Sequence, residues 1–133
     1  MSTRDRGYNP IEYHNGTVWP HDTSLVAEGL RRYGYRHDAS RLAASMLDAA
    51  TYFDHRLPEV FAGYPRAATS VPVEYPTASK PQAWAAGTPL LGLRTLLGLD
   101  VVDGTLSVDP IVPETYGRLR LRDIKVRGMR FDA

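Results

Sequence analysis

The sequence predicts a mainly helical fold that ends in a short antiparallel β tail. Apolar residues recur at helical spacing in the first half of the chain, whereas residues 100–133 alternate between apolar and polar. A chain of 133 residues also has room for one compact unit rather than two. We therefore expect a helical part over residues 1–99 and a strand-rich tail over residues 100–133.

Two helices are expected first. The apolar residues of the first helix share one face: Leu25, Val26, Gly29, Leu30 and Tyr33. Either Asp22 or Thr23 can cap its start. The second helix begins near Asp38, and its apolar stripe contains Leu42, Met46, Ala49, Ala50 and Phe53. Because the connection is short, the two helices should pack as an antiparallel hairpin.

An irregular stretch follows, up to about Ser79. Loops of this length are rare in compact domains unless they are functional or disordered. Several of its side chains are too apolar for a solvated tail: Phe61, Tyr64, Val71, Val73 and Tyr75. The pattern indicates an ordered loop that crosses a binding face.

A third helix should run from Pro81 to Gly98, with a kink or interruption near Thr88 because Pro89 removes a hydrogen bond. It is apolar around most of its circumference, so we expect burial on more than one side. In the tail, short antiparallel strands should include Leu119 and Leu121, with a slip in phase at residues 122–123 and a turn at residues 127–128.

The composition excludes several function classes. A net charge of +1 gives no electrostatic case for nucleic acid or for a membrane surface. There are no cysteines, and the four histidines lack metal-site spacing, so we expect neither a metal nor a cofactor. No apolar run reaches the length of a membrane span, and this favours a cytoplasmic protein.

The helices create a packing problem. Three helices, one of them apolar almost all round, cannot cover each other's faces with so little else in the chain. Either a second copy covers them or the sequence is a piece of a larger fold.

Three stretches carry a resemblance to a known family: "YNPIEYHNGTVWPHD", "LPEVFAG" and "YPTASKPQAWAAG". In this order and spacing, and together with the tail "DPIVPETYGRLRLRDIKVRG", they resemble the C-terminal part of bacterial amylo-α-1,6-glucosidases and glycogen-debranching-type proteins. These belong to the six-hairpin glycosidases. The resemblance implies part of an (α/α)6 toroid, an oligosaccharide or glycan substrate, and inverting hydrolysis of an α-glucosidic bond.

Inverting hydrolysis uses two carboxyl groups roughly 6.5–9.5 Å apart, one as general acid and one as general base. By the resemblance, Glu59 matches the position of the base. Pro58 disfavours continued helix before it, and Gly63 permits a sharp turn after it. Glu74 is the fallback base, although an exposed loop charge is its simpler interpretation.

The resemblance also implies a sugar pocket. Trp19, His21 and Asp22 lie in the segment that lines it, where an aromatic face and polar neighbours can bind a sugar ring. Core packing of Trp19 and helix capping by Asp22 are the alternatives. Gln82 and Trp84 are further candidates, with a core position as the alternative for the tryptophan. The remaining and weaker candidates of the same kind are Tyr64 and Arg66.

The general acid of the related enzymes lies in the N-terminal half of the toroid, which we expect to be missing from this chain. The chain alone should therefore show negligible hydrolysis. Three function classes remain open: a glycosidase segment completed by the rest of the toroid, an inactive carbohydrate-binding remnant, and an oligomer-forming interaction protein. The expected partners are thus a glycan and either the missing half of the toroid or a second copy.

Overall fold

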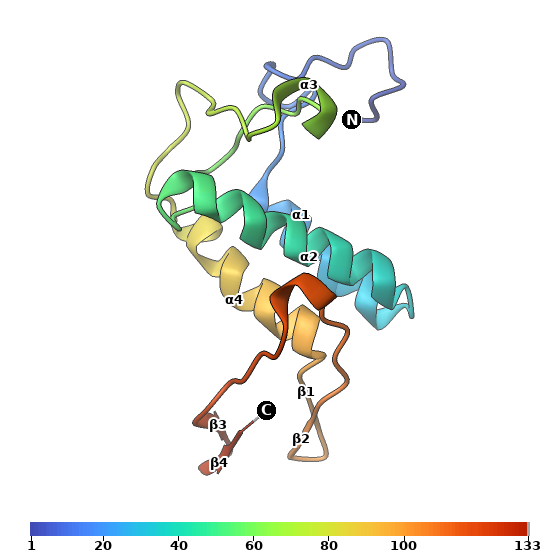
Figure 1. Ribbon diagram of the computed structural model, residues 1–133, viewed down its shortest axis with the longest axis vertical. Helices are drawn as coiled ribbons and strands as arrows, with labels where there is room; N and C mark the ends of the chain where they lie inside the picture. Colours follow the sequence, from blue (N-terminus) through green and yellow to red (C-terminus); the bar gives the residue numbers. More distant parts are fainter. Residues whose placement is uncertain (133) are drawn as a thin grey trace.

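The structure, a computed structural model, describes residues 1–132. Three helices form a bundle in its middle: α1 (Pro20–Arg32), α2 (Arg36–Ala50) and α4 (Ala83–Leu97). The remaining elements are short: η1 (Thr51–Phe53), α3 (Arg66–Thr69), β1 (Asp100–Val102), β2 (Thr105–Ser107), η2 (Glu114–Tyr116), β3 (Ile124–Val126) and β4 (Met129–Phe131). The N-terminal segment and the loop around α3 lie at one end of the bundle, and the two β-hairpins lie at the other (Figure 1). The expected mainly helical fold with a β tail is confirmed at this level, while the division at residues 99 and 100 stays a prediction.

The predicted hairpin of α1 and α2 is present, but its first cap is not the expected one. Trp19 is the N-cap residue of α1, Pro20 occupies the first helical position, and no side chain in the described part of the chain caps the helix. Asp22 and Thr23 lie inside the first turn, so their assignment as caps was wrong. The Asp22 carboxylate still lies where the helix dipole favours negative charge.

The apolar face of α1 points away from the bundle. Leu25 is 53% exposed and Val26 is 56% exposed, whereas Ser24, Ala27 and Glu28 are buried. The face that packs is therefore the one with small side chains. Small residues let helix axes approach closely, which compensates for the absence of large apolar side chains on that face.

The core consists of two clusters that share the bundle. One cluster lies at the centre of the three helices and contains Ala27, Ala43 and Leu96. The other joins the end of α2 and the start of α4 to the irregular loop: Met46, Ala49, Ala50, Phe53, Leu57, Phe61 and Ala85. Because the loop supplies Leu57 and Phe61 to this core, it is an ordered part of the fold, as expected.

The third predicted helix differs in its start and in its continuity. It begins at Ala83 rather than Pro81, with Gln82 as the N-cap residue. It continues through Pro89, so the expected interruption near Thr88 was wrong. The helix is held by tertiary burial on both sides of the proline, where Ala85 and Leu96 are fully buried. Such packing outweighs one missing backbone hydrogen bond.

Burial of α4 is also less complete than the composition suggested. Trp84 is 59% exposed and Leu90 is 72% exposed, so one side of the helix faces outward. The helix ends at Gly98, which adopts a left-handed conformation with φ 60°. A Cβ at this glycine would lie 2.0 Å from the carbonyl oxygen of Asp109, so only glycine fits the approach of the tail.

The tail contains two separate hairpins, β1–β2 and β3–β4. The predicted turn at Arg127–Gly128 is confirmed, whereas the predicted strand at Leu119 and Leu121 is not formed. Between the hairpins, the Tyr116 hydroxyl donates a hydrogen bond to Asp48 at 2.8 Å and also contacts the carbonyl oxygen of Ala44 at 2.9 Å. This contact anchors the tail to α2, which leaves residues 117–121 to span the gap rather than to pair.

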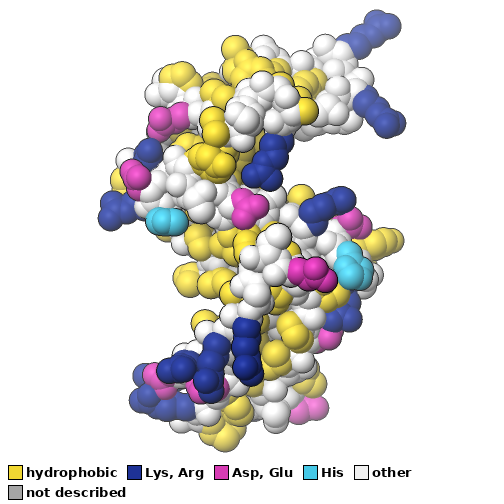
Figure 2. Space-filling view, in the orientation of Figure 1, with side chains coloured by type: hydrophobic (Ala, Val, Ile, Leu, Met, Phe, Trp, Pro, Cys, Tyr) yellow, Lys and Arg dark blue, Asp and Glu magenta, His cyan; other side chains and the backbone are white. Residues whose placement is uncertain are grey.

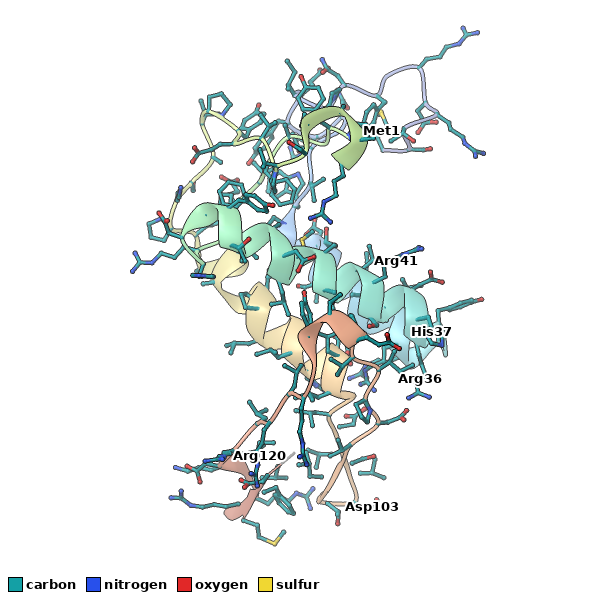
Figure 3. The ribbon with its side chains drawn as sticks, viewed as in Figure 1. Met1, Arg36, His37, Arg41, Asp103 and Arg120 are labelled. Carbon is teal, nitrogen blue, oxygen red and sulfur yellow. The ribbon has the colours of Figure 1, made fainter. Side chains whose placement is uncertain are left out.

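The charged groups of the tail remain at the surface. Lys and Arg side chains gather at the lower end of the molecule, over β3–β4 (Figure 2). Arg120 and Arg130 contact Asp132 and Asp123, and all four side chains are exposed. Exposed ion pairs of this kind contribute little to stability. The first half of α2 carries three labelled side chains, Arg36, His37 and Arg41 (Figure 3). This part of α2 and the turn at Asp103 between β1 and β2 both lie away from Met1.

One buried carboxylate connects α1 to α4 and β1. The Glu28 side chain, only 10% exposed, accepts hydrogen bonds from Arg31 at 2.9 and 3.0 Å and from Arg32 at 3.0 Å. Thr95 of α4 donates a further bond at 3.0 Å, and Arg31 reaches Asp100 at 3.4 Å. Burial raises the pKa of Glu28, but the bonds from Arg31, Arg32 and Thr95 outweigh it and lower the pKa to about 2.

Replacing Glu28 should destabilise the bundle. Glu28→Gln leaves Arg31 without its main buried partner and should lower the free energy of unfolding at pH 7 by about 2–4 kcal/mol. Asp38→Asn is the matched control, because Asp38 pairs with Arg41 at the same spacing in an exposed position. It should cost less than about 1 kcal/mol. Chemical denaturation measures both, and equal losses would contradict this role of Glu28.

The role of the Glu28 carboxylate can also be tested by the pH dependence of stability. The folded-state pKa of Glu28 lies below its ordinary value of 4.5. Its contribution to stability is therefore complete above pH 4.5 and is lost as the pH falls through about 2. The difference in unfolding free energy between the natural chain and Glu28→Gln should shrink over this window. A difference that stays constant from pH 7 to pH 3 would contradict the assignment.

Candidate functional site

The site is built on residues 59–63, which run between two other segments of the chain. Val18 and Phe61 exchange backbone hydrogen bonds of 2.8 and 3.0 Å. On the other side, the amide of Ala62 donates to the carbonyl oxygen of Val73 at 2.9 Å. Residues 59–63 thus lie between two neighbouring segments, as the middle strand of a sheet would, although they are joined to them by isolated bridges rather than by a regular ladder.

A close backbone approach locks the N-terminal segment onto this strand. The Gly63 amide donates to the carbonyl oxygen of Pro10 at 2.8 Å, and its own carbonyl accepts from the Tyr8 hydroxyl. A Cβ at Gly63 would lie 1.7 Å from the carbonyl oxygen of Gly16. The glycine therefore serves this approach rather than the sharp turn that the sequence suggested.

Glu59 is held at both ends of its carboxylate. The Tyr13 hydroxyl donates a hydrogen bond to Oε1, and the Ser79 amide donates one to Oε2 at 2.9 Å. The Glu59 amide in turn donates to the Ser79 carbonyl oxygen at 3.0 Å. These bonds favour the charged form and lower the pKa of Glu59 below its ordinary value. The bond from Tyr13 has the larger effect, and the bond from Ser79 has the smaller one.

The Tyr13 ring belongs to an aromatic cluster. Its centroid lies 4.8 Å from that of Trp19, 4.6 Å from that of His14 and 5.8 Å from that of Tyr75. The Trp19 indole N–H donates to the Thr17 hydroxyl at 3.1 Å, and that hydroxyl donates to the carbonyl oxygen of Tyr13. The segment therefore fixes the orientation of Tyr13 and Trp19 together.

An open hollow joins this cluster to the start of α4. We call it the Glu59 hollow; it has a volume of about 540 Å³ and is lined by Tyr13, His14, Trp19, Glu59, Gln82, Ala83 and Trp84. Its size lies within the range of small-molecule sites. The Gln82 side-chain oxygen is buried and has no hydrogen-bond partner among residues 1–132. The hollow thus combines two tryptophans, one carboxylate and the side chain of Gln82.

The segment before α1 supplies the other predicted residues. The His21 ring lies 4.8 Å from that of Trp84 between centroids, and so supports one wall of the Glu59 hollow from outside. Asp22 lines a second hollow, which shares His14, Trp19 and Trp84 with the first. Glu59, Trp19, Gln82 and Trp84 are therefore brought together, with His21 and Asp22 adjoining them.

The other candidates do not reach the Glu59 hollow. Tyr64 and Arg66 line a separate, mainly apolar cavity between α2 and the loop near α3. Glu74 is exposed and pairs with Lys80 at 3.2 Å. The structure thus agrees with the simpler interpretation of Glu74, and it gives Tyr64 and Arg66 no place beside the carboxylate.

Tyr13 and His14 are site residues that the sequence reasoning missed. Both lie within the stretch "YNPIEYHNGTVWPHD", which carries the family resemblance, but the candidates selected from it were Trp19, His21 and Asp22. A further signal is the run of aromatic rings at Tyr8, Tyr13, His14 and Trp19, since a solvated tail rarely contains so many. Glu59, the hydrogen-bond partner of Tyr13, lies 46 positions away in the sequence, so no local pattern could have joined the two.

The Glu59 hollow has two tryptophan side chains in its lining and a hydrogen-bonded carboxylate at its edge. The model of the mannosylglycerate hydrolase MGH1-like glycoside hydrolase domain matches residues 1–70. This is more than half of the chain, and the chain belongs to that family. The match supports a glycosidase-type enzyme. No curated protein matches the chain.

No group of three or more His, Asp or Glu side chains in residues 1–132 is arranged to hold a metal ion. None of the helices in that part of the chain has the length and apolar character that a membrane crossing requires.

The close approach at Gly63 can be tested by mutation. Gly63→Ala should lower stability by roughly 1–3 kcal/mol, because the new methyl group meets a backbone oxygen that cannot move without breaking the strand. Gly29→Ala is the control, since a Cβ there meets no described atom within 4 Å and the site is helical. It should stabilise the chain by up to ~1 kcal/mol. Thermal unfolding measures the stability of both variants. A Gly63→Ala variant as stable as the natural chain would contradict the close approach of Gly63 to Gly16.

Proposed function

We propose that the chain is the base-bearing part of an inverting glycoside hydrolase, with Glu59 as general base. The observation that supports this proposal is the Glu59 carboxylate beside Trp19 and Trp84 at the edge of one hollow. In such a reaction the base removes a proton from water while the water attacks the anomeric carbon, and an acid protonates the leaving oxygen. A base must be ionised to act, and the bonds from Tyr13 and Ser79 favour that state.

The sugar ring would lie in the Glu59 hollow. The faces of Trp19 and Trp84 suit the apolar side of a pyranose, and the side-chain amide of Gln82 suits a hydroxyl group. His21 would orient Trp84, and Asp22 would contact substrate from the adjoining hollow.

The substrate class follows from the family rather than from this hollow. The family is named for mannosylglycerate hydrolase, which favours a glycosyl bond to a small organic acid over the α-1,6 branch of a glucan. The described residues that line the hollow include no Lys or Arg, so they suit the sugar and not the carboxylate of such an acid. The α-1,6-glucosidic linkage of a glycogen-debranching enzyme remains the alternative.

The general acid is not assigned to this chain. We propose that α1, α2 and α4 are part of an (α/α)6 toroid whose other helices carry the acid. The chain alone would then hydrolyse glycosides negligibly. We place the protein in the cytoplasm. Sugar binding without hydrolysis by the completed protein would instead identify a carbohydrate-binding remnant.

A second candidate function is self-association. It is favoured by the outward apolar side chains of α1 and α4, where Val26 and Trp84 line the same hollow and Leu25 and Leu90 are exposed. In the toroid further helices would cover these side chains, and in their absence a second copy can do so.

The catalytic proposal predicts a large loss for one carboxylate only. In an active enzyme that contains this chain, Glu59→Gln should lower kcat on the order of 10²–10⁴-fold with little change in KM, because the amide cannot accept the proton. Glu74→Gln, a matched change at an exposed loop glutamate, should leave kcat nearly unchanged. Release of mannose from mannosylglycerate, and of glucose from isomaltose, measures turnover and compares the two linkages. A near-normal kcat in Glu59→Gln would reject Glu59 as the base.

The self-association proposal predicts a change of mass on mutation. The natural chain should form dimers in a sedimentation-equilibrium concentration series, and Val26→Glu should make it monomeric because a charge cannot be buried in that contact. Val102→Glu is the control, since Val102 has the same 56% exposure but lies on β1. A natural chain that stays monomeric, or equal effects of the two variants, would count against the surface of α1 and α4.

A further inference from the structure

We propose that Tyr13 is the positioning residue of the Glu59 carboxylate, which it aims into the hollow and keeps available to accept a proton. This inference rests on the proposed function of Glu59 as the base. It assigns a specific task to a side chain that lies far from Glu59 in sequence and is joined to it by a direct hydrogen bond.

The argument begins with the geometry of the carboxylate. Each carboxylate oxygen has two acceptor positions, about four in all. Tyr13 occupies one on Oε1, and the Ser79 amide occupies one on Oε2. Two donors on opposite oxygens fix the rotation of the group, and each oxygen retains a position for water. Ser79 alone would leave the carboxylate free to turn about its last bond.

Tyr13 is itself held well enough to position another group. Trp19 packs edge-on against its ring at 4.8 Å, His14 contacts it at 4.6 Å and Tyr75 lies at 5.8 Å. Its backbone carbonyl oxygen accepts the Thr17 hydroxyl, which also receives the Trp19 indole N–H. The wall that would bind the sugar and the donor that holds the base therefore form one unit.

The hydrogen bond also discriminates between the two protonation states of Glu59. A phenol donates a stronger bond to a carboxylate than to a neutral carboxylic acid. The bond therefore favours return of the proton from Glu59 to solvent after each turnover. The pKa shifts agree with this direction, since the pKa of Glu59 is lowered and the bond to Glu59 raises the pKa of Tyr13.

The test is a carboxyl-carbon NMR titration of Glu59 in the full chain. Tyr13→Phe keeps the ring and removes the donor, so the Glu59 midpoint should rise toward its ordinary value of 4.5. Tyr75→Phe is the matched control, because it removes a hydroxyl from the same aromatic cluster. The Tyr75 hydroxyl makes no hydrogen bond to Glu59 among the described contacts. Its midpoint should equal that of the natural chain. An unchanged midpoint in Tyr13→Phe, or equal shifts in both variants, would overturn the inference.

A second measurement covers the case in which Tyr13→Phe does not fold. Site-specific replacement of Tyr13 by 3-fluorotyrosine keeps the hydroxyl and makes it a stronger donor, so the midpoint of Glu59 should fall below that of the natural chain. A midpoint that rises or stays in place would overturn the inference. The proposed function fails separately: if Glu59→Gln retains activity, Glu59 is not the base, whatever the titrations show.

Discussion

The site depends on the backbone hydrogen bonds that hold residues 59–63 between two other segments. On one side the strand bonds to Pro10 and Val18, and on the other it bonds to Val73 and Ser79. Without these bonds Glu59 would be a loop carboxylate with many orientations, and ordering it for each reaction would cost conformational entropy. With them, the chain presents one side chain at a fixed place. The close contact of Gly63 with Gly16 follows from the same constraint.

The helices provide the base on which this strand rests. Leu57 and Phe61 alternate into the core formed by α2 and α4, so the loop and the bundle share apolar burial. The Ala-rich contacts and the Glu28 network hold α1 against α4, which places Trp19 before one helix and Trp84 at the start of the other. The two tryptophans therefore face one hollow because two helix N-termini meet there. The outward apolar side chains of the same helices explain how such a unit could be part of a larger assembly.

The elements with local signals were predictable from the sequence. The α1–α2 hairpin, the ordered loop and the turn at Arg127–Gly128 all follow from spacing or turn chemistry over a few residues. Grouping Glu59 with Trp19, Gln82 and Trp84 came from the family resemblance rather than from spacing, and the structure brings these four residues to one hollow.

The features that failed depend on tertiary structure. Periodicity identified the apolar face of α1 but could not give its direction, and α4 continues through Pro89 because buried contacts on both sides hold it. Tyr13 was missed because its partner lies in another segment. The alternation at Leu119 and Leu121 has no strand to pair with once Tyr116 is anchored on α2. Each failure is a case in which long-range packing outweighed local preference.

Amide hydrogen exchange tests the central claim most directly, because it reports whether residues 59–63 are held by the bonds described. The amides of Phe61 and Gly63 donate to the carbonyl oxygens of Val18 and Pro10 in the N-terminal segment, and the Ala62 amide donates to that of Val73, whereas the Tyr64 amide has no backbone partner among the described hydrogen bonds. The account predicts that the first three amides are protected and lose protection together, while Tyr64 exchanges at the rate of an open chain. Exchange of Phe61, Ala62 and Gly63 as fast as that of Tyr64 would show that the strand is not held and that Glu59 has no fixed position.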